Sequence, residues 1–399
     1  MALTIRYSTW DDFPYVKTIN ARAENTHRSL SDSIYEAHKF VFPPDRNIMA
    51  FDGKNIVGNA LSYSMDMYIP GGISKIAAVA SVSVQATHRR QGINRQIMKF
   101  QLENIHEREE PIAVLQASES IIYGRYGYGM SSFDAQLKID RMHSSFATEN
   151  SNIGDLSFIE DPEARIIFPE VYERAIMNRT GMVTRSTNWW NFRFINPIMD
   201  GSITNYWNVK FIENDTCEGY VRYTISGTEL EIIELIANTE NAYSSLWEFC
   251  LNMDLVTSIK APRRPIDDEL KWMLADPRRL RETLSDRYWI RIVDLCAAMQ
   301  NRTYSIDGSI VIKIRDEFLP WNNGTIQITS ESGTSTCKFV NLNADLEMTT
   351  ADLASTYING INFSVLQNAK RVLEITPGSI LKANQMFATD RAPWCMDGW

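Results

Sequence analysis

The stretch SVSVQATHRRQGIN, residues 81–94, runs from the end of an apolar strand into the start of a helix. The strand is expected from Ile73 to Val84 and the helix from Ile93 to Glu107, since apolar side chains recur at helical spacing over the second segment. A helix N-terminus carries unpaired N–H groups and a partial positive charge, which favour a bound phosphate. Gly92 would let the backbone approach that phosphate closely. The junction is therefore a candidate anion site, although a solvated basic rim would give the same pattern.

Positive charge is concentrated around this junction. Between Met67 and Leu102 there are five Lys or Arg and no acidic residue, whereas the whole chain has a net charge of -9. Arg89, Arg90 and Arg95 could pair with a phosphate. The overall acidity argues against nucleic acid as the partner and is better suited to a cationic small molecule.

Composition limits the class of protein. The chain has 399 residues, of which 44% are apolar and 22% charged, and this balance is typical of a globular protein with several domains. No apolar stretch approaches the roughly 20 residues of a membrane span, and the first residues resemble a strand, not a signal peptide. We therefore expect a cytoplasmic protein without a membrane partner. The five scattered cysteines form no CxxC pair and all five histidines lie at or before His143, so no metal site is expected.

Three regions differ in their pattern of predicted elements. Residues 1–145 alternate strands and helices and should form an α/β layer. The polar stretch SSFATENSNIGD, residues 144–155, is a plausible linker to a second α/β region, 146–290, which includes a helix near residues 169–178. A strand at 288–292 straddles the start of the third region, residues 291–399. This region combines further strands with helices. The predicted fold class is a multidomain protein of the α+β and α/β types.

The segment Arg89-Arg90-Gln91-Gly92-Ile93-Asn94 resembles the Q/R-x-x-G-x-G/A pyrophosphate loop of the GNAT acetyltransferases, with Asn94 in place of the last small residue. The segment is neither a Walker A loop nor a GxGxxG loop. The resemblance implies acetyl-CoA as cosubstrate, without a metal, and a strand whose backbone pairs with the pantetheine arm. The residues that it assigns to the cofactor are Val82, Ser83, Val84, Arg89, Arg90, Gln91, Gly92, Ile93, Asn94, Arg95, Ser118 and Glu119.

The stretches ASE, residues 117–119, and IYGRYGYG, residues 122–129, make the resemblance more specific. They look like the enhanced intracellular survival (Eis) acetyltransferases, a GNAT branch in which ASE…IYGRFGYG follows the CoA loop at about this distance. Stretches at 172–181, 289–299 and 344–360 extend the resemblance over the whole chain. It implies a GNAT domain at 1–145, a second GNAT-like region without a CoA loop at 146–290, and a sterol-carrier-like domain at 291–399.

The same resemblance assigns roles within the aromatic cluster. Tyr123 is the general acid that gives its proton to the departing CoA thiolate, while Tyr126 and Tyr128 pack. Ser118 and Glu119 border the cofactor, although Glu119 could equally be a solvated acid at a strand end. A tight aromatic turn without any chemistry would also explain the cluster. The N–H of Val82 could receive the developing oxyanion.

The chain ends in NQMFATDRAPWCMDGW, residues 384–399, which is unusually apolar for a free end. We expect this end to dock on the protein. Docking could be structural alone. The family resemblance instead implies that the α-carboxylate of Trp399 enters the first domain's active site and acts as general base, so that the amine attacks the thioester directly.

The acceptor stays open at this level. The resemblance implies acetylation of aminoglycosides at several amines, or of lysine side chains in peptides and proteins. It also implies that the protein is a homo-oligomer, a hexamer. Acids that could line a pocket for cations, if they are not simply charged surface, are Glu24, Asp32, Glu36 and Asp397. Residues 20–42 do not closely match the family. A third alternative is a non-catalytic carrier of apolar ligands with a degenerate first domain.

Overall fold

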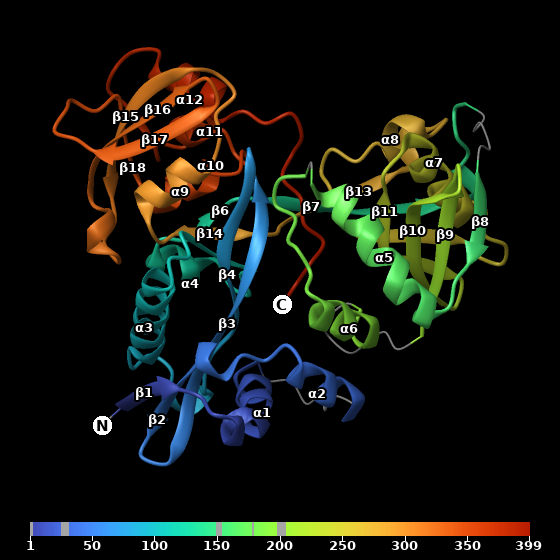
Figure 1. Ribbon diagram of the computed structural model, residues 1–399, viewed down its shortest axis with the longest axis horizontal. Helices are drawn as coiled ribbons and strands as arrows, with labels where there is room; N and C mark the ends of the chain where they lie inside the picture. The colour runs from blue at the N-terminus through green and yellow to red at the C-terminus, as the bar shows by residue number, and fades with distance from the viewer. Residues whose placement is uncertain (1–2, 25–31, 149–153, 178, 198–204) are drawn as a thin grey trace.

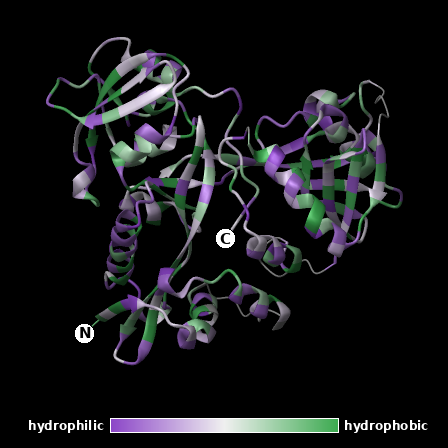
Figure 2. Ribbon diagram, viewed as in Figure 1, coloured by the Kyte–Doolittle hydropathy of each residue, from purple (hydrophilic) through white to green (hydrophobic). Residues whose placement is uncertain are grey.

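The computed structural model describes residues 3–24, 32–148, 154–177, 179–197 and 205–399. Three β-sheets organise them, and Figure 1 shows the third sheet above the first, the second sheet to one side, and the C-terminus between the first and the second. Apolar and polar residues alternate along many strands (Figure 2), which is the pattern of sheets with differently exposed faces. None of the helices in the described ranges has the length and apolarity needed to span a bilayer.

The first sheet carries the predicted anion site. Its strands lie in the order β1-β2-β3-β4-β5-β14-β6. β4 and β5 are parallel neighbours, but among the described residues they pair only over Ile76–Ala78 and Ile112–Val114, while β4 continues to Val84. The two strands therefore part beyond Ala78. The strands are β1 (Leu3–Tyr7), β2 (Asn47–Asp52), β3 (Asn55–Ile69), β4 (Gly72–Val84), β5 (Ile112–Leu115), β6 (Gly129–Met130) and β14 (Trp289–Ile292).

Helices cover both faces of this sheet. α3 (Ile93–Glu107) has the predicted bounds and buries Met98, Leu102 and Ile105 against one face. The opposite face is covered by α1 (Phe13–Glu24), α2 (Asp32–Lys39) and α6 (Thr187–Ile195), within the largest apolar cluster. Since α3 follows directly on the loop after β4, its N-terminus lies where β4 and β5 have parted.

The second sheet repeats this arrangement without the anion site. Its strands lie in the order β13-β7-β12-β11-β10-β9-β8, and α7 (Glu240–Leu251) joins the parallel strands β11 and β12 as α3 joins β4 and β5. At the start of α7 the Glu213 carboxylate accepts hydrogen bonds from Thr239 Oγ1 at 3.0 Å and Asn241 Nδ2 at 2.6 Å. The chain's own carboxylate thus occupies the position of a bound anion. The strands are β7 (Phe133–Asp140), β8 (Asp155–Phe158), β9 (Trp207–Glu213), β10 (Thr216–Ser226), β11 (Glu229–Ala237), β12 (Ser258–Arg264) and β13 (Arg281–Asp286).

The third sheet has the order β17-β16-β15-β18-β19 and packs with four helices. The region combines strands with helices, as expected. The elements are β15 (Gly308–Arg315), β16 (Gly324–Glu331), β17 (Thr334–Phe339), β18 (Leu346–Thr349), β19 (Leu373–Glu374), α9 (Leu295–Asn301), α10 (Thr350–Thr356), α11 (Phe363–Asn368) and α12 (Ser379–Phe387).

A strand crosses each expected boundary between regions. β7 precedes residue 145 but lies in the second sheet, between β12 and β13. β14, which spans the boundary near residue 290, lies in the first sheet between β5 and β6. Local sequence identifies each segment as a strand, but its neighbours in the sheet depend on the tertiary fold. The first and second sheets are therefore interlocked by exchange of strands.

The helix expected near residues 169–178 begins earlier. α5 spans Asp161–Ile176 and contains Pro169 in its interior. An interior proline removes a backbone hydrogen bond and usually marks a helix end, which is why the sequence pattern placed the start there. The buried side chains of Ala164, Phe168 and Tyr172 hold the helix on the second sheet across the proline.

Candidate active site

The loop before α3 has the geometry of an anion site. Gly92 is the N-cap residue, with a φ of 80° that disfavours any side chain, and a Cβ built there would meet no atom within 4 Å. The first N–H groups of α3 have no intrahelical acceptor and face this open space. Arg90, Gln91 and Arg95 are exposed around it. These residues fit a pyrophosphate group.

Two residues of the loop have structural partners that the sequence did not indicate. The Arg89 guanidinium donates to the carbonyl oxygen of Ala23 at the end of α1, so it braces the loop against that helix. Asn94 Nδ2 donates to the hydroxyl of Tyr126 at 3.2 Å. The polar side chain in the last position of the loop therefore ties α3 to the aromatic turn, and it leaves the helical backbone at Asn94 intact.

A bulge interrupts β4 before the loop. Ser81 has a φ of 53°, and the register between β3 and β4 shifts at this point. Asn59 Nδ2 donates to the carbonyl oxygen of Ser81 at 3.0 Å and supports the bulge from β3. A bulge turns the strand and redirects its backbone groups. Val82 and Val84 beyond it are half-buried, and the buried Ser83 donates through Oγ to Asn20 Oδ1 at 2.7 Å.

The three tyrosines of the aromatic cluster differ in their surroundings. Tyr123, at the end of α4 (Ser120–Tyr123), is 6% exposed and packs in the cluster that contains Val79 and Leu115, on the α3 face of the sheet. Tyr128 makes an edge contact with Tyr123 at 5.9 Å between ring centroids. Its hydroxyl has no partner among the described residues, and burial raises the pKa of Tyr128 well above its usual range.

Ser118 and Glu119 precede α4 and are exposed. Glu119 is the N-cap residue of α4 but makes no capping hydrogen bond through its side chain. Both residues lie between the end of β5 and Tyr123 in the chain. Their position is compatible with either interpretation made from the sequence, a border of the cofactor site or a solvated strand end.

The C-terminal tail, residues 393–399, bridges the opening between β4 and β5. The indole N–H of Trp399 donates to the carbonyl oxygen of Val79 on β4 at 2.9 Å. Two residues earlier, the carbonyl oxygen of Asp397 accepts from Gln116 Nε2, directly after β5, at 2.9 Å. Trp399 also packs on Tyr288, with 5.1 Å between ring centroids, and contacts the apolar cluster that covers the face opposite α3. The last residue of the chain therefore lies where β4 and β5 part.

Asp397 is neither a pocket acid nor charged surface, the two roles that the sequence left open. Its side chain is fully buried, 2.9 Å from Arg185 and 3.6 Å from Arg193, and it accepts a hydrogen bond from the Tyr172 hydroxyl at 2.8 Å. Burial alone would raise the pKa of Asp397, but the charges of these two arginines and the hydrogen bonds lower it overall. Asp397 is thus an ionised anchor of the tail.

Of the three other candidate acids, the structure describes the side chain of Glu36. Glu36 is exposed and pairs with Lys39 at 2.6 Å. The side chains of Glu24 and Asp32 lie outside the described residues. Sequence reasoning also missed the partners of the tail, which are Gln116, Tyr172, Arg185, Arg193, Arg287 and Tyr288. They are scattered over the first two regions, and no local pattern marks them.

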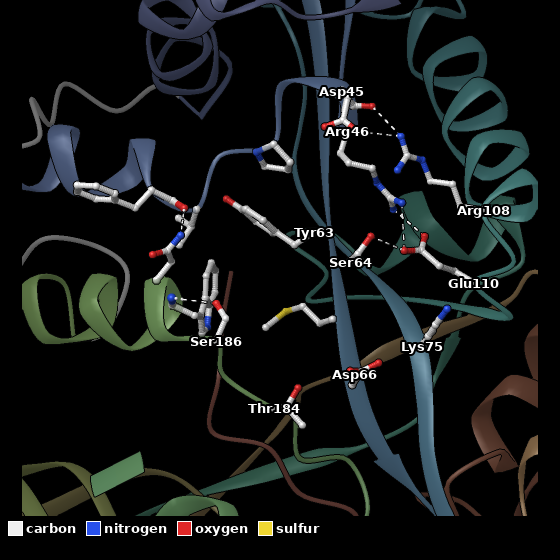
Figure 3. A pocket seen from close by; sticks show the side chains of 16 residues that line it. Asp45, Arg46, Tyr63, Ser64, Asp66, Lys75, Arg108, Glu110, Thr184 and Ser186 are labelled. Atoms are coloured by element: carbon white, nitrogen blue, oxygen red, sulfur yellow. Dashed lines mark hydrogen bonds and ion pairs between the residues drawn. The ribbon is translucent and has the colours of Figure 1, made fainter. Parts of the chain in front are cut away.

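A cavity of about 750 Å³ lies beside β3, on the side of α2 and α6. Figure 3 shows Tyr63, Ser64 and Asp66 along β3, with the Arg46–Glu110 ion pair (2.7 Å) closing one end. Phe40 and Val41, from the region expected to bind the acceptor, also line it. Neither Tyr123 nor Trp399 is a lining residue, so this cavity is separate from the opening between β4 and β5.

Comparison with domain families divides the chain in three. Residues 4–131 match an acetyltransferase (GNAT) domain, residues 181–292 match a second acetyltransferase (GNAT) domain, and residues 295–396 match a sterol carrier protein domain. The predicted fold class, with two GNAT domains followed by a sterol-carrier-like domain, is confirmed.

Individual relatives span nearly the whole chain. An uncharacterised N-acetyltransferase of Streptomyces avermitilis is 32% identical over 368 residues, which cover 89% of this chain and 90% of the relative. The N-acetyltransferase Eis of Mycobacterium tuberculosis is 26% identical over 98% of both chains. The crystal structure of Eis1 from Mycobacterium abscessus superimposes with a TM-score of 0.87 and 28% identity, covering 99% of this chain and 100% of that one. The resemblance read from the sequence is confirmed, and so is an acetyltransferase activity.

Proposed function

Because this chain belongs to the Eis-like branch of the GNAT N-acetyltransferases, we propose that it transfers the acetyl group of acetyl-CoA directly to an amine of a cationic small molecule, such as an aminoglycoside. The observation that carries the proposal is the position of the tail. Trp399 bonds to the backbone of β4 at the point where β4 and β5 part. This contact of the Trp399 indole supports a role for the α-carboxylate of the same residue at the opening.

The cofactor would be held by the loop before α3. The N-terminus of α3, Arg90 and Arg95 would bind the pyrophosphate, and the backbone of Val82 and Val84 would pair with the pantetheine arm. Acetyl-CoA supplies the activated acetyl group. The bulge at Ser81 and the short pairing of β4 with β5 leave the backbone at the end of β4 available for such a partner.

The base and the acid would approach the thioester from opposite faces. Tyr123 packs with Val79 on the α3 face, whereas Trp399 packs with the cluster that includes Ala78 and Ala80 on the other face. We propose that the α-carboxylate of Trp399 removes a proton from the amine as it attacks. The Tyr123 hydroxyl then donates its proton to the departing CoA thiolate. Such acid–base steps typically contribute about 10²–10⁴-fold to the rate.

A cationic acceptor is favoured by charge. The chain carries a net charge of -9, which attracts polycations over distances of about a Debye length. The second candidate acceptor is the lysine side chain of a basic peptide or protein.

An acetyl-CoA turnover screen tests the proposal and separates these acceptors. The purified protein is mixed with acetyl-CoA and either an aminoglycoside or a lysine-containing basic peptide, and thiol release is followed. We expect faster release with the aminoglycoside, and the aminoglycoside should inhibit acetylation of the peptide competitively. Preferential acetylation of the peptide would instead identify a lysine side chain as the preferred acceptor. Absence of release with every amine, together with binding of apolar ligands, would favour a carrier.

A further inference from the structure

The second domain contains a fully buried cluster of charges, and the C-terminal tail adds a second carboxylate to it. Three arginines, Arg185, Arg193 and Arg222, surround the carboxylate of Glu234 at distances of 2.8, 4.0 and 4.0 Å. The side chains of all four residues are at most 1% exposed. Without another anion, three cations would share one carboxylate away from water. Burying unbalanced charge is strongly unfavourable, so this cluster requires a further anion.

Asp397 supplies that anion from the tail. Arg185 contacts it at 2.9 Å, Arg193 at 3.6 Å, and Tyr172 from α5 donates to it at 2.8 Å. Every one of these side-chain partners belongs to the second domain. The cluster is therefore a receptor for a carboxylate, and the chain's own C-terminal segment is its ligand.

The backbone of the same residue is held by Gln116 of the first domain and by Arg287 and Tyr288, which directly precede β14. The carbonyl oxygen of Asp397 accepts hydrogen bonds from Gln116 Nε2 at 2.9 Å and from the Tyr288 hydroxyl at 3.2 Å, and Arg287 also donates to it. From Asp397 to Trp399 the chain advances two residues, at most about 7 Å. Trp399 is then fixed by its hydrogen bond to Val79. The α-carboxylate thus follows a point that is clamped from both domains.

We infer that Asp397 is a positioning residue, and that the second domain serves to hold the C-terminus at the reaction centre. This inference rests on the proposed role of the Trp399 carboxylate as base. Asp397 itself touches no reacting atom. Misplacing a reacting group by about 1 Å can cost about 10²-fold in rate. A shift of the second domain's arginines would therefore displace the tail and lower the turnover rate at the first domain's active site.

The absence of a cofactor loop in the second domain agrees with this role. Its equivalent helix start is occupied by Glu213, bonded to Thr239 and Asn241. The buried charges lie instead on Arg185, α6, β10 and β11, on the side from which the tail enters. A domain that lost the cofactor would keep such a cluster if its remaining task were to anchor the tail.

The test uses Asp397→Asn in the full-length enzyme, because asparagine keeps the shape and removes the charge. Carboxypeptidase digestion followed by mass spectrometry measures whether the tail is docked. We expect the wild-type tail to be protected and the variant tail to be removed at least ten times faster. We expect kcat to fall about 10- to 100-fold with an unchanged KM for acetyl-CoA. Tyr172→Phe removes the hydroxyl that contacts Asp397 and the carbonyl oxygen of Val183, each at 2.8 Å, and should change both quantities in the same direction by less.

Asp390→Asn is the matched control, since Asp390 lies in the same segment but is exposed. It should leave tail protection and kcat unchanged. A tail that stays protected in Asp397→Asn would overturn the positioning role, whatever the rate. A tail that is released while kcat is retained would overturn the role of the terminal carboxylate as base and would leave the anchor intact. If Asp397→Asn does not fold, Tyr172→Phe decides by the same two measurements.

Discussion

At the scale of single residues, the site depends on two groups that reach β4 from opposite faces. Tyr123 is buried with Val79 beneath α3, and Trp399 bonds to the carbonyl oxygen of Val79 from the other side. Neighbouring aromatic residues have other tasks: Tyr126 is bonded by Asn94, and Tyr128 is enclosed. Because their surroundings differ in this way, we propose a catalytic role for Tyr123 and not for Tyr126 or Tyr128.

Replacing Tyr123 by Phe should lower kcat by about 10²-fold or more, because it removes the proposed proton donor. The KM for acetyl-CoA should change little. Steady-state kinetics with thiol detection measures both. Tyr126→Phe is the control, since it removes a hydroxyl that only bonds to Asn94. Full activity of Tyr123→Phe would exclude it as the acid.

The buried carboxylate of Glu234 makes stability depend on pH. Burial alone would raise the pKa of Glu234, but the charges of Arg185, Arg193 and Arg222 outweigh it and lower the pKa overall. A group with a lowered folded pKa contributes stability that is complete above the unfolded pKa, about 4.3, and is lost as the pH falls through the folded pKa.

Glu234→Gln should therefore destabilise the fold by about 3–5 kcal/mol at neutral pH, because it leaves buried arginines unpaired. The difference from wild type should shrink as the pH falls below about 4. Thermal or urea unfolding between neutral and acidic pH measures this. The control is Glu231→Gln on the same strand, whose pair with Lys260 is partly exposed and worth about 1 kcal/mol or less. Equal effects of the two variants would contradict the buried-charge argument.

At the scale of elements, the candidate anion site depends on the conformation of the chain between β4 and α3. The bulge at Ser81 turns the end of β4, and Gly92 adopts a left-handed conformation before α3 starts. In the equivalent unit of the second domain, β11–α7, Thr239 is the N-cap residue of the helix, and its hydroxyl donates to the Glu213 carboxylate. Two units with the same topology therefore differ in the groups that surround the start of the helix.

Gly92→Ala tests this unit. Forcing alanine to a φ of 80° should cost about 1 kcal/mol, and the altered loop should raise the Kd for acetyl-CoA several-fold. Gly53→Ala is a matched control, because Gly53 also has a positive φ and open space around it but lies in the turn between β2 and β3. Calorimetric titration measures affinity, and thermal unfolding measures stability. Similar losses of stability with unequal affinities are expected, whereas unchanged affinity of Gly92→Ala would move the cofactor elsewhere.

At the scale of the whole molecule, the proposed reaction centre combines segments that are far apart in the chain. The first domain supplies the loop and Tyr123, the second supplies the receptor for Asp397, and the tail leaves the third domain after α12 and runs back to β4 (Figure 1). The strand exchange of β7 and β14 keeps the first two domains in a fixed relation. A catalytic C-terminus requires such rigidity, since the carboxylate has no element of its own.

Extending the chain by a few residues after Trp399 should lower the turnover rate by about 10²-fold or more, while the protein stays folded. The extension converts the carboxylate into an amide and removes the proposed base. Kinetics and circular dichroism measure activity and folding. The same residues added before Met1 serve as the control and should be harmless. Normal acetylation by the extended chain would contradict a terminal base.

The sequence by itself determined the elements around the cofactor and the order of the domains. The bounds of α3 and the positions of β2, β3 and β4 follow from local periodicity and turn residues, and the loop at 89–94 is a local motif. The predicted helix at 169–178 was wrong at its start, because the propensity of Pro169 to end a helix was outweighed by packing of Phe168 and Tyr172 on the second sheet.

Only the tertiary structure decided the other half of the site. Asp397 reads as one more acid in a tail, yet it is buried because Arg185, Arg193 and Tyr172, some 200 residues earlier, meet it in space. The contact of Trp399 with Val79 and the place of β14 beside β5 likewise join segments that are remote in the chain. Charge pairing and strand pairing depend on distance in space, and local sequence patterns carry no information on that distance.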